Sequence, residues 1–585
     1  MLPEQPQRHA TSPPGAAPAA VAWLLYLPAF GILLLYLWAF LGHAWSVVRF
    51  PFQIDYGEMP ELNRAWLIAQ GRPIYVDWSH PPYQMANYTP LYSTAAAGGV
   101  LLLGVQFFTG RLLSLASTLL AGACVAAIAR ALGAAPRDAL LGGLLYFAGH
   151  PVWNWGALQR VDSLAVGLEL LGIAVFSWGW VRAQDEGRRT NDESGGLRRG
   201  FVLRPSSFVV RPPGALWAVW ATVPIFLAAV YTRQTVVAGA LACYGYLLFC
   251  RPRLAGAVIA GYVLAGAALF VALQALTGGY FWRHVIDGNL NRWSWATVEL
   301  YWRPFWRLLH WTLPFAAVAA LAAAARRQAQ VPLLYLLASA ATALTIGKIG
   351  SNVNYLLQPW AALALMVALA AAQVHQLATA FAATVAARPW LGTLAGAIPA
   401  VWLLVGLQQA FHVPYERDGA DVRPKSPAAV FARLQWTRWP LWRLDPWGVP
   451  PGELATFFPR AYREDPSAGD LEAARRAHDY VAATPGEVLG EEMSFTVTTG
   501  RRIYLQPFEF TQLAEQGAWD QRPLLQDIAQ QRFAVVVLRF RLDEDPTWRV
   551  QRVNQSMIAA LAPAYELAAG FGNYYLYVPK VGSGQ

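Results

Sequence analysis

The chain has 585 residues, of which 56% are hydrophobic and only 14% charged, and its formal net charge is +10. A soluble protein usually carries about a quarter charged residues, so this composition excludes an ordinary soluble protein. The positive charge is mostly arginine near the ends of apolar segments, which fits membrane topology signals and anionic lipid head groups. No Lys/Arg stripe is interleaved with exposed aromatics on a soluble module, so nucleic acid is not an expected partner.

In chain order, residues 1–20 are rich in proline and alanine and predict a disordered cytoplasmic tail. The first apolar segment is too long for a signal-peptide core, and no small-residue cleavage site follows it, so we expect a retained span. Apolar segments, several of them short for a span, then recur through a module at 21–410. They lie near residues 21–48, 90–105, 107–131, 138–153, 162–182, 214–231, 235–250, 254–277, 305–325, 331–346, 352–374 and 390–410.

The arginines indicate which loops face the cytoplasm. The polar, arginine-rich stretch 183–213 reads as a flexible cytoplasmic loop, and Arg130 and Arg137 should lie on the same side. Both conditions hold if the weak segment 90–105 is an interfacial or re-entrant helix. We therefore predict an all-α polytopic membrane protein with about 11 transmembrane helices plus interfacial helices, in the plasma or inner membrane. This topology places on the outer face residues 50–89, 150–162, 278–304, 346–352 and everything after about 410.

The part from 411 to 585 differs in composition, with more charge and proline-rich connections. Residues 470–483 have helical periodicity, and LLQDIAQQ at 524–531 predicts a further helix. Between and after them, short segments cluster or alternate β-forming residues, as in FAVVVLRF and YYLYVP. We predict a small extracytoplasmic α/β domain.

Three acids, Asp55, Glu58 and Glu61, follow the first span directly, in the loop 50–89. A carboxylate in mid-membrane costs about 2.5–3.5 kcal/mol on insertion scales, whereas one at the interface stays hydrated. Solvated loop acids are one interpretation. The many aromatic and proline residues of this loop favour another, in which it packs at the interface and holds the acids in place.

The spacing of these residues resembles a known family. An acidic D-x-x-E after the first span, then A-x5-G-x3-Y-x-D from Ala65 to Asp77, resembles the GT-C superfamily of membrane glycosyltransferases, which use polyprenyl-phosphate sugars. Within it the chain is similar to protein O-mannosyltransferases (glycosyltransferase family 39) and lipid A aminoarabinose transferases. The first loop lacks the adjacent Asp-Glu pair. Further matching phrases are HPPY, NYTPLY, GRLLSLASTLLAGACVAAIAR, RVDSLAVGLELLGIAVF and KIGSNVNYLLQPWAALAL.

The resemblance covers roughly residues 20–410 and implies a hexosyl- or pentosyltransferase. Such an enzyme moves a sugar from a polyprenyl-phosphate donor to a hydroxyl of a glycan, lipid or protein acceptor at the outer membrane edge. Asp55 is the candidate general base, since a carboxylate within hydrogen-bond reach can deprotonate the attacking hydroxyl. Direct displacement would invert the anomeric centre through an oxocarbenium-like transition state. Glu58 and Asp162 complete the expected catalytic set.

The leaving group would be a lipid phosphate, so cations and polar side chains should surround it. Arg111 could hold phosphate in bidentate fashion, although simple snorkelling explains it equally well. The other candidate substrate-binding residues, each with an ordinary role as interfacial anchor, helix cap or turn residue as its alternative, are His80, Tyr88, Arg233, Lys348, Asn352, Asn354 and Tyr355.

Two further questions stay open at the level of sequence. Asp55, Glu58 and Asp162 could supply oxygen ligands to Mg²⁺ or Mn²⁺, although spacing alone does not show a metal site. A polytopic lipid or sugar transporter or flippase without transferase activity is the alternative function. It would favour inverted repeats and polar groups at the bilayer midplane, and the sequence shows no convincing repeat.

Overall fold

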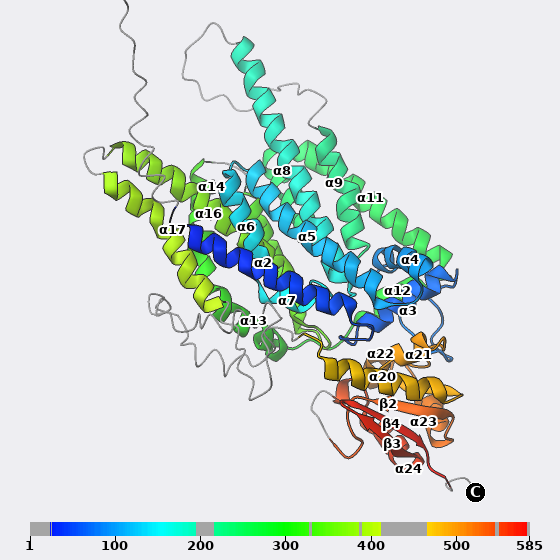
Figure 1. The fold of residues 1–585 in the computed structure, drawn as a ribbon. Helices are drawn as coiled ribbons and strands as arrows, with labels where there is room; N and C mark the ends of the chain where they lie inside the picture. The colour runs from blue at the N-terminus through cyan, green and yellow to red at the C-terminus, as the bar shows by residue number, and fades with distance from the viewer. Residues whose placement is uncertain are drawn as a thin grey trace, which may run out of the picture.

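The computed structural model describes residues 24, 26–194, 216–326, 330–384, 389–410, 465–544 and 549–581. A helical bundle is followed in the chain by a small domain that contains the only sheet among these residues, and Figure 1 shows the two parts. The predicted tail 1–20 and residues 411–464 lie outside the described residues. So do residues 195–213 of the predicted cytoplasmic loop.

The bundle contains helices of very different length. Within the described residues, five stretches are long and apolar enough to cross a membrane: Tyr26–Arg49, Phe107–Ala131, Val161–Trp180, Pro252–Leu276 and Val353–Phe381. A pair bent by 61°, Trp295–Arg307 with His310–Ala324, could form a sixth span. The chain is thus a multi-pass membrane protein, as the composition predicts, while the number of about 11 crossings stays a prediction.

The bounds of the bundle helices follow the apolar segments of the sequence closely. In chain order they are α2 (Tyr26–Arg49), α3 (Glu58–Ala69), α4 (Leu91–Leu103), α5 (Phe107–Ala131), α6 (Pro136–Phe147), α7 (His150–Trp155), α8 (Val161–Ser194), α9 (Leu216–Val230), α10 (Ala238–Cys250), α11 (Pro252–Leu276), α12 (Tyr280–Val285), α13 (Trp295–Leu309), α14 (Leu313–Arg326), α15 (Val331–Ala343), α16 (Leu357–Thr384) and α17 (Pro389–Ala410).

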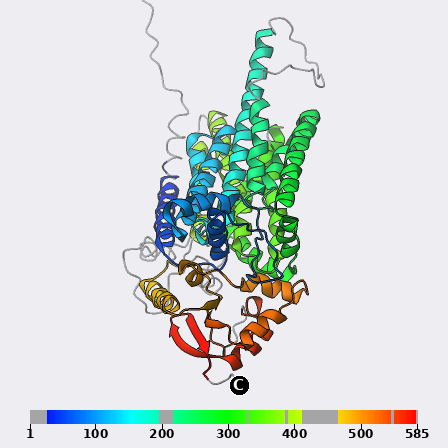
Figure 2. The ribbon, with the colours of Figure 1, turned by 90° about the vertical axis from the view of Figure 1, so that its right-hand side faces the viewer.

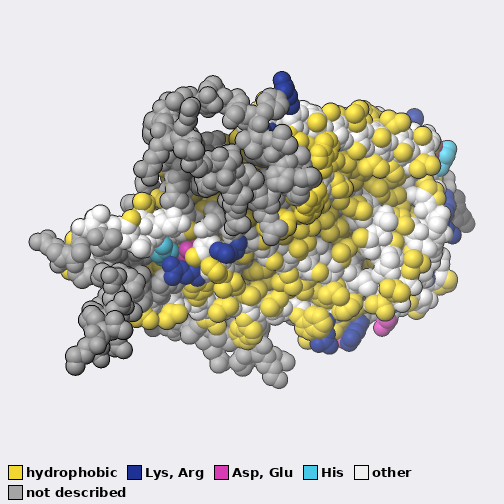
Figure 3. All heavy atoms as spheres, turned by 90° about the horizontal axis from the view of Figure 1, so that it is seen from above, with side chains coloured by type: hydrophobic (Ala, Val, Ile, Leu, Met, Phe, Trp, Pro, Cys, Tyr) yellow, Lys and Arg dark blue, Asp and Glu magenta, His cyan; other side chains and the backbone are white. Residues whose placement is uncertain are grey.

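The helix α16 forms the centre of the bundle, because 89% of its apolar window is buried. Small residues allow its neighbours to approach closely: a Cβ on Gly142 of α6 would lie 2.7 Å from the Cβ of Ala368. By contrast, only 11% of the apolar window of α11 is buried. Its exposed large residues are Val263, Leu264, Leu269, Val271 and Leu276. The face of the molecule in Figure 3 is mostly hydrophobic, with charged side chains in a few places, as a lipid-facing surface requires.

Residues 465–581 fold into the predicted α/β domain. Its sheet has the order β1-β2-β4-β3, formed by β1 (Glu487–Gly490), β2 (Phe533–Leu538), β3 (Tyr565–Phe571) and β4 (Tyr574–Pro579). The strand β2 pairs in parallel with β1 and antiparallel with β4. The helices around the sheet are α20 (Ala468–Ala483), α21 (Ser494–Thr498), α22 (Pro507–Glu515), α23 (Arg522–Ala529) and α24 (Gln555–Ala564).

The domain lies at one end of the bundle, opposite the end where α8 protrudes (Figure 2). It is joined there to the loop between α2 and α4. Tyr83 exchanges two backbone hydrogen bonds with the segment after α21, donating to the Tyr504 carbonyl (2.8 Å) and accepting from the Gln506 amide (3.0 Å). Tyr56 accepts a hydrogen bond from the amide of Phe508 and donates one to Glu509. The loop 50–89 is therefore a packed layer between bundle and domain.

Candidate active site

A buried ion pair fixes the chain where it leaves α2. Glu58 and Arg111 are both fully buried, and two nitrogens of Arg111 each donate to Glu58 at 2.7 Å. Arg111 also donates to the carbonyls of Val47, Phe50 and Phe52. Burial alone would raise the pKa of Glu58, but its partners, Arg111 first, hold that pKa below its ordinary value. Glu58 is thus an ionised carboxylate inside the protein.

Glu58 in turn orients Asp55. One of its oxygens accepts the backbone amides of Ile54 (2.9 Å) and Asp55 (3.1 Å), which closes a tight turn before α3. The Asp55 carboxylate accepts the amide of Gly57 at 3.0 Å. Its side chain is 17% exposed, so it is held in place and yet accessible. Glu58 has the contacts of a positioning residue, whereas Asp55 has those of a residue that could meet a substrate.

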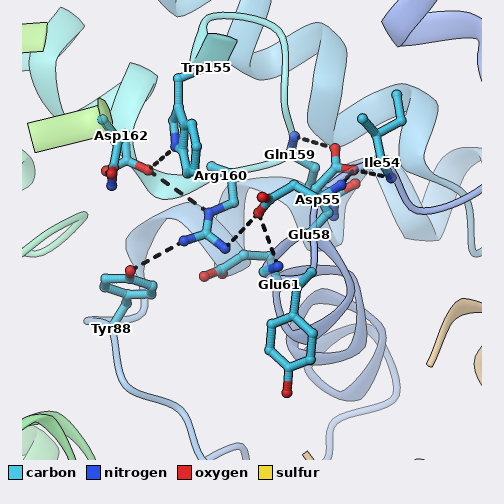
Figure 4. Close-up of polar contacts among 12 residues, drawn as sticks. Ile54, Asp55, Glu58, Glu61, Tyr88, Trp155, Gln159, Arg160 and Asp162 are labelled. Carbon is cyan, nitrogen blue, oxygen red and sulfur yellow. Dashed lines mark hydrogen bonds and ion pairs between the residues drawn. The ribbon is translucent and has the colours of Figure 1, made fainter. Parts of the chain in front are cut away.

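Arg160 links the two acids predicted to share a site (Figure 4). Its Nη1 lies 3.3 Å from Asp55, and its Nε lies 4.0 Å from Asp162. Its remaining nitrogen is 3.5 Å from the hydroxyl of Tyr88. Burial would lower the pKa of Arg160, but Tyr88 and the two acids raise it, so the bridge is permanently charged. Asp55 and Asp162 are therefore separated by a single guanidinium group.

Asp162 stands at the start of α8, fully buried and surrounded by donors. The indole nitrogen of Trp155 donates to it at 2.7 Å, the amide of Asn354 donates at 2.9 Å, and Arg233 forms an ion pair with it. These partners come from the end of α7, from the segment after α9 and from the segment before α16. Asp162 thus joins the segments that close this end of the bundle.

A cluster of cations lies on the far side of Asp162. The guanidinium of Arg233 lies 4.2 Å from the ring centre of Tyr355, and Lys348 donates to Asn289 at 3.1–3.2 Å. Burial lowers the pKa of Lys348, which means that its surroundings leave the ammonium short of compensating charge. Arg233 is buried, and within the described part of the chain its Nε and Nη2 meet no hydrogen-bond partner. Such nitrogens are rare in folded proteins, and they are available here to water or to an anionic group.

The structure gathers some of the sequence-predicted residues and separates others. Asp55, Asp162 and their partners Tyr88, Arg233 and Asn354 form one connected set. His80 is exposed on the loop 50–89, and Asn352 accepts the amide of Val353 as a helix-capping residue. The nitrogens of Arg111 point at Glu58 and backbone carbonyls, so we leave Arg111 out of the phosphate site proposed below.

Sequence reasoning did not select Arg160, Trp155 or Gln53 as site residues. Arg160 is only two positions from Asp162, and this proximity was a usable signal. Gln53 carries no such signal, yet it is buried and helps to line a cavity of about 320 Å³ beside Asp55. Across the cavity lie Glu491, Glu492 and other residues of the C-terminal domain.

The predicted Mg²⁺ or Mn²⁺ site stays a prediction. Arg160 lies between Asp55 and Asp162, and Glu58 is taken up by Arg111 and three amides. Over the described ranges no group of three His, Cys, Asp or Glu side chains has the arrangement of a metal site.

The chain can be compared with protein-family profiles, with curated protein sequences and with solved structures. No protein-family profile and no curated protein sequence matches the chain. Among solved structures, it is similar to ArnT from Cupriavidus metallidurans. With the form bound to undecaprenyl phosphate it shares 15% identity and a TM-score of 0.50, over 96% of this chain and 99% of that one. The protein has the ArnT fold.

The apo form of that ArnT gives the same result, with 15% identity and a TM-score of 0.51 over 96% of this chain and 98% of that one. An oligosaccharyltransferase, AglB from Archaeoglobus fulgidus, matches with 13% identity and a TM-score of 0.36, over 93% and 74% of the two chains. This similarity in fold agrees with the predicted architecture, an α-helical membrane module followed by a small C-terminal α/β domain.

Proposed function

We propose that the protein is a membrane glycosyltransferase, one that moves a sugar from a polyprenyl-phosphate donor to an acceptor hydroxyl at the outer face of a cell membrane. The observation that carries the proposal is the state of Arg233. Its guanidinium is buried, and two of its nitrogens have no hydrogen-bond partner among the described residues. It forms an ion pair with Asp162 and lies near Lys348. Buried cations with unfulfilled donors are suited to an anionic phosphate.

The donor phosphate is assigned to Arg233 and Lys348. Arginine and lysine differ here in a useful way: the guanidinium can hold two phosphate oxygens, while the ammonium acts as a compact point charge. Both lie at the end of the bundle where α8 begins and α9 ends. An isoprenoid tail can remain among lipids while its head group reaches these residues from the side.

Asp55 is assigned the role of general base. It lies on the opposite side of Arg160 from Asp162, so the acceptor and the donor phosphate would approach the anomeric carbon from different directions. This arrangement is that of an inverting displacement, in which the acceptor oxygen attacks opposite the leaving phosphate. Arg160 holds the Asp55 carboxylate in place at 3.3 Å, as a positioned base requires.

The ArnT structure bound to undecaprenyl phosphate supports this choice of donor class, because a protein with the same fold holds such a lipid. The donated sugar, hexose or pentose, is left to experiment. No observation favours the transporter alternative: Asp55 and Asp162 are joined through Arg160, and Asp55 lines a cavity shared with the C-terminal domain.

The test is donor consumption by the full-length protein in membranes, with undecaprenyl-phosphate-linked hexoses and pentoses and with release of undecaprenyl phosphate as the readout. Wild type should release it, and Asp55→Asn should be slower by about 10²–10⁴-fold, the contribution of a general base. Asp520→Asn, the same change at an exposed aspartate of the C-terminal domain, should match wild type. Equal rates for Asp55→Asn and wild type would refute the proposal.

A further inference from the structure

A polar cavity lies between the first outer loop and the C-terminal domain, with Asp55 in its wall. Its volume is about 320 Å³, at the lower end of the ~300–1,000 Å³ typical of ligand pockets. One side comes from the loop after α2 and the other from the ends of β1, β2 and β4 and from the segment before α24. The lining residues are Gln53, Ile54, Asp55, Tyr56, Glu491, Glu492, Arg539, Arg552 and Asn573.

The two arginines of this cavity are already paired. Arg552 forms an ion pair with Glu491 and lies 4.9 Å from the ring centre of Tyr56. Arg539 pairs with Glu492 at 3.3 Å and lies 4.4 Å from the ring centre of Tyr574. Asp55 is paired with Arg160 in the same way. Among the described residues that line the cavity, both guanidiniums are therefore already neutralised by carboxylates, and an anionic ligand would find no unpaired cation there.

The cavity instead presents hydrogen-bond acceptors. Gln53 is 8% exposed, and its Oε1 has no hydrogen-bond partner among the residues that the structure describes. Glu491 and Glu492 are 2% and 1% exposed, so the wall of the cavity contains carboxylate groups that water barely reaches. A buried acceptor without a donor costs about 1–3 kcal/mol, which a ligand rich in hydroxyl groups can recover.

We propose that this cavity binds an uncharged sugar residue of the acceptor, with the attacking hydroxyl beside Asp55 and another hydroxyl donating to Gln53 Oε1. The assignment rests on the proposed function and adds the class of acceptor: a neutral, hydroxyl-rich group in place of a phosphorylated one. It also gives the C-terminal domain a role in acceptor recognition, because Glu491, Glu492 and Asn573 form half of the wall.

The reaction balances in this arrangement. The acceptor hydroxyl gives its proton to Asp55, and its oxygen forms a bond to the anomeric carbon. The bond from that carbon to the donor phosphate oxygen breaks, and its electron pair stays on the phosphate at Arg233 and Lys348. Asp55 afterwards returns the proton to solvent.

The test is binding of simple sugars to the full-length protein in nanodiscs, measured by saturation-transfer NMR without any donor. The probes are glucose, galactose, mannose, N-acetylglucosamine and glucose 6-phosphate. At least one neutral sugar should bind, and glucose 6-phosphate should bind more weakly than glucose. Gln53→Met, which keeps the volume and removes the acceptor, should weaken binding about tenfold, the effect of about 1.4 kcal/mol.

Gln526→Met, the same change at an exposed position of α23, should leave sugar binding unchanged. Asn573→Ala is a second test, for use if Gln53→Met does not fold. Asn573 is an exposed residue at the rim of the cavity, so its replacement should leave the core intact and weaken sugar binding. Absence of binding by all four neutral sugars, or tighter binding of glucose 6-phosphate, would overturn the assignment.

The binding measurement is separate from transfer. Loss of sugar binding with intact Asp55-dependent donor consumption would overturn the acceptor site alone. Sugar binding that depends on Gln53, in a protein that consumes no polyprenyl-phosphate sugar, would support the cavity assignment and refute the proposed transferase.

Discussion

Gly57 allows Arg160 to reach Asp55. A Cβ at position 57 would lie 1.0 Å from Nη1 of Arg160, the nitrogen that contacts Asp55. The backbone of Gly57 has φ −76°, which any residue adopts, so the requirement for glycine is one of space. A single missing side chain thus makes room for the guanidinium between the two acids.

We expect Gly57→Ala to displace the Arg160 guanidinium and to lower donor consumption about 100-fold, because a misplacement of about 1 Å near reacting groups has effects of this size. The steady-state rate of undecaprenyl phosphate release measures it. Gly98→Ala in α4, where a new Cβ meets nothing within 4 Å, is the matched control and should keep the wild-type rate. A fully active Gly57→Ala protein would show that the Arg160 bridge is dispensable.

Glu492 should make the stability of the C-terminal domain depend on pH. Burial raises the pKa of Glu492 from 4.5 to about 7, although Arg539 opposes the shift. Between pH 4.5 and 7 the folded state then binds more protons than the unfolded state, so the free energy of unfolding falls as the pH rises through this window, by up to about 3 kcal/mol.

Thermal unfolding of the full-length protein in detergent at pH 5 and pH 8 measures this dependence. The domain should unfold at a lower temperature at pH 8, and Glu492→Gln should reduce the difference. Glu472→Gln, at an exposed glutamate of α20, should not. A difference between the two pH values that Glu492→Gln leaves intact would locate the titrating group elsewhere.

At the scale of elements, two carboxylates join α8 to its neighbours. Asp162 contacts Asn354 just before α16, and Glu169, seven residues further along α8, accepts from Gln358 of α16 at 2.7 Å. Glu169 also accepts the amide of Gly239 (2.7 Å) at the start of α10 and the hydroxyl of Tyr335 (3.1 Å) in α15. An acid inside a membrane helix is costly unless partners surround it, and here four helices supply and share them.

Replacement of Glu169 by alanine leaves three buried donors unpaired, which costs about 1–3 kcal/mol each. We expect Glu169→Ala to lower the unfolding temperature of the detergent-solubilised protein by several degrees or to prevent its accumulation. Glu299→Ala, at an exposed glutamate paired with Arg303 on α13, should change it little. An unchanged unfolding temperature for Glu169→Ala would show that this network does not hold the helices together.

The elements themselves were largely predictable, and the contacts between them were not. Apolar segments predicted most of the bundle helices, and alternation of β-forming residues predicted strands near 533–538 and 574–579, because each signal is local. Two boundaries differ. The helix α8 continues to Ser194 into the predicted loop, over a stretch that contains no proline. The chain bends near 310, where Pro314 cannot donate to a preceding carbonyl.

The partly predictable site has the same explanation. Asp55 and Asp162 are charged residues beside apolar segments, so their type and place stand out in the sequence. Gln53 and Glu169 acquire their roles only from groups at least 70 residues away, such as Gly239 for Glu169, and no local sequence pattern predicts such a pairing. The sequence also does not show that the guanidinium of Arg111 donates its hydrogen bonds to backbone carbonyls.

At the scale of the whole molecule, the loops predicted to lie outside meet one another. The loop 50–89 contacts Arg160 and the C-terminal domain, and Trp293 pairs with Lys348 in an isolated bridge. The protruding end of α8 points the opposite way (Figure 2). This supports a single-sided site, and the side of the membrane on which it lies can be measured.

We expect His80→Cys and Glu472→Cys, in protein with Cys250→Ala, to react with a membrane-impermeant maleimide added outside intact cells. Both positions are exposed on the side of the site. Thr190→Cys, near the far end of α8, should react only after the cells are opened. Labelling of Thr190→Cys from outside would invert the predicted orientation.

The most direct measurement of the central claim is a cryo-EM map of the full-length protein with undecaprenyl phosphate bound. The account predicts phosphate density within about 3 Å of the Arg233 and Lys348 nitrogens, on the side of Arg160 away from Asp55. Phosphate density at the opposite end of the bundle, or beside Asp55 within the cavity assigned to the acceptor, would contradict it.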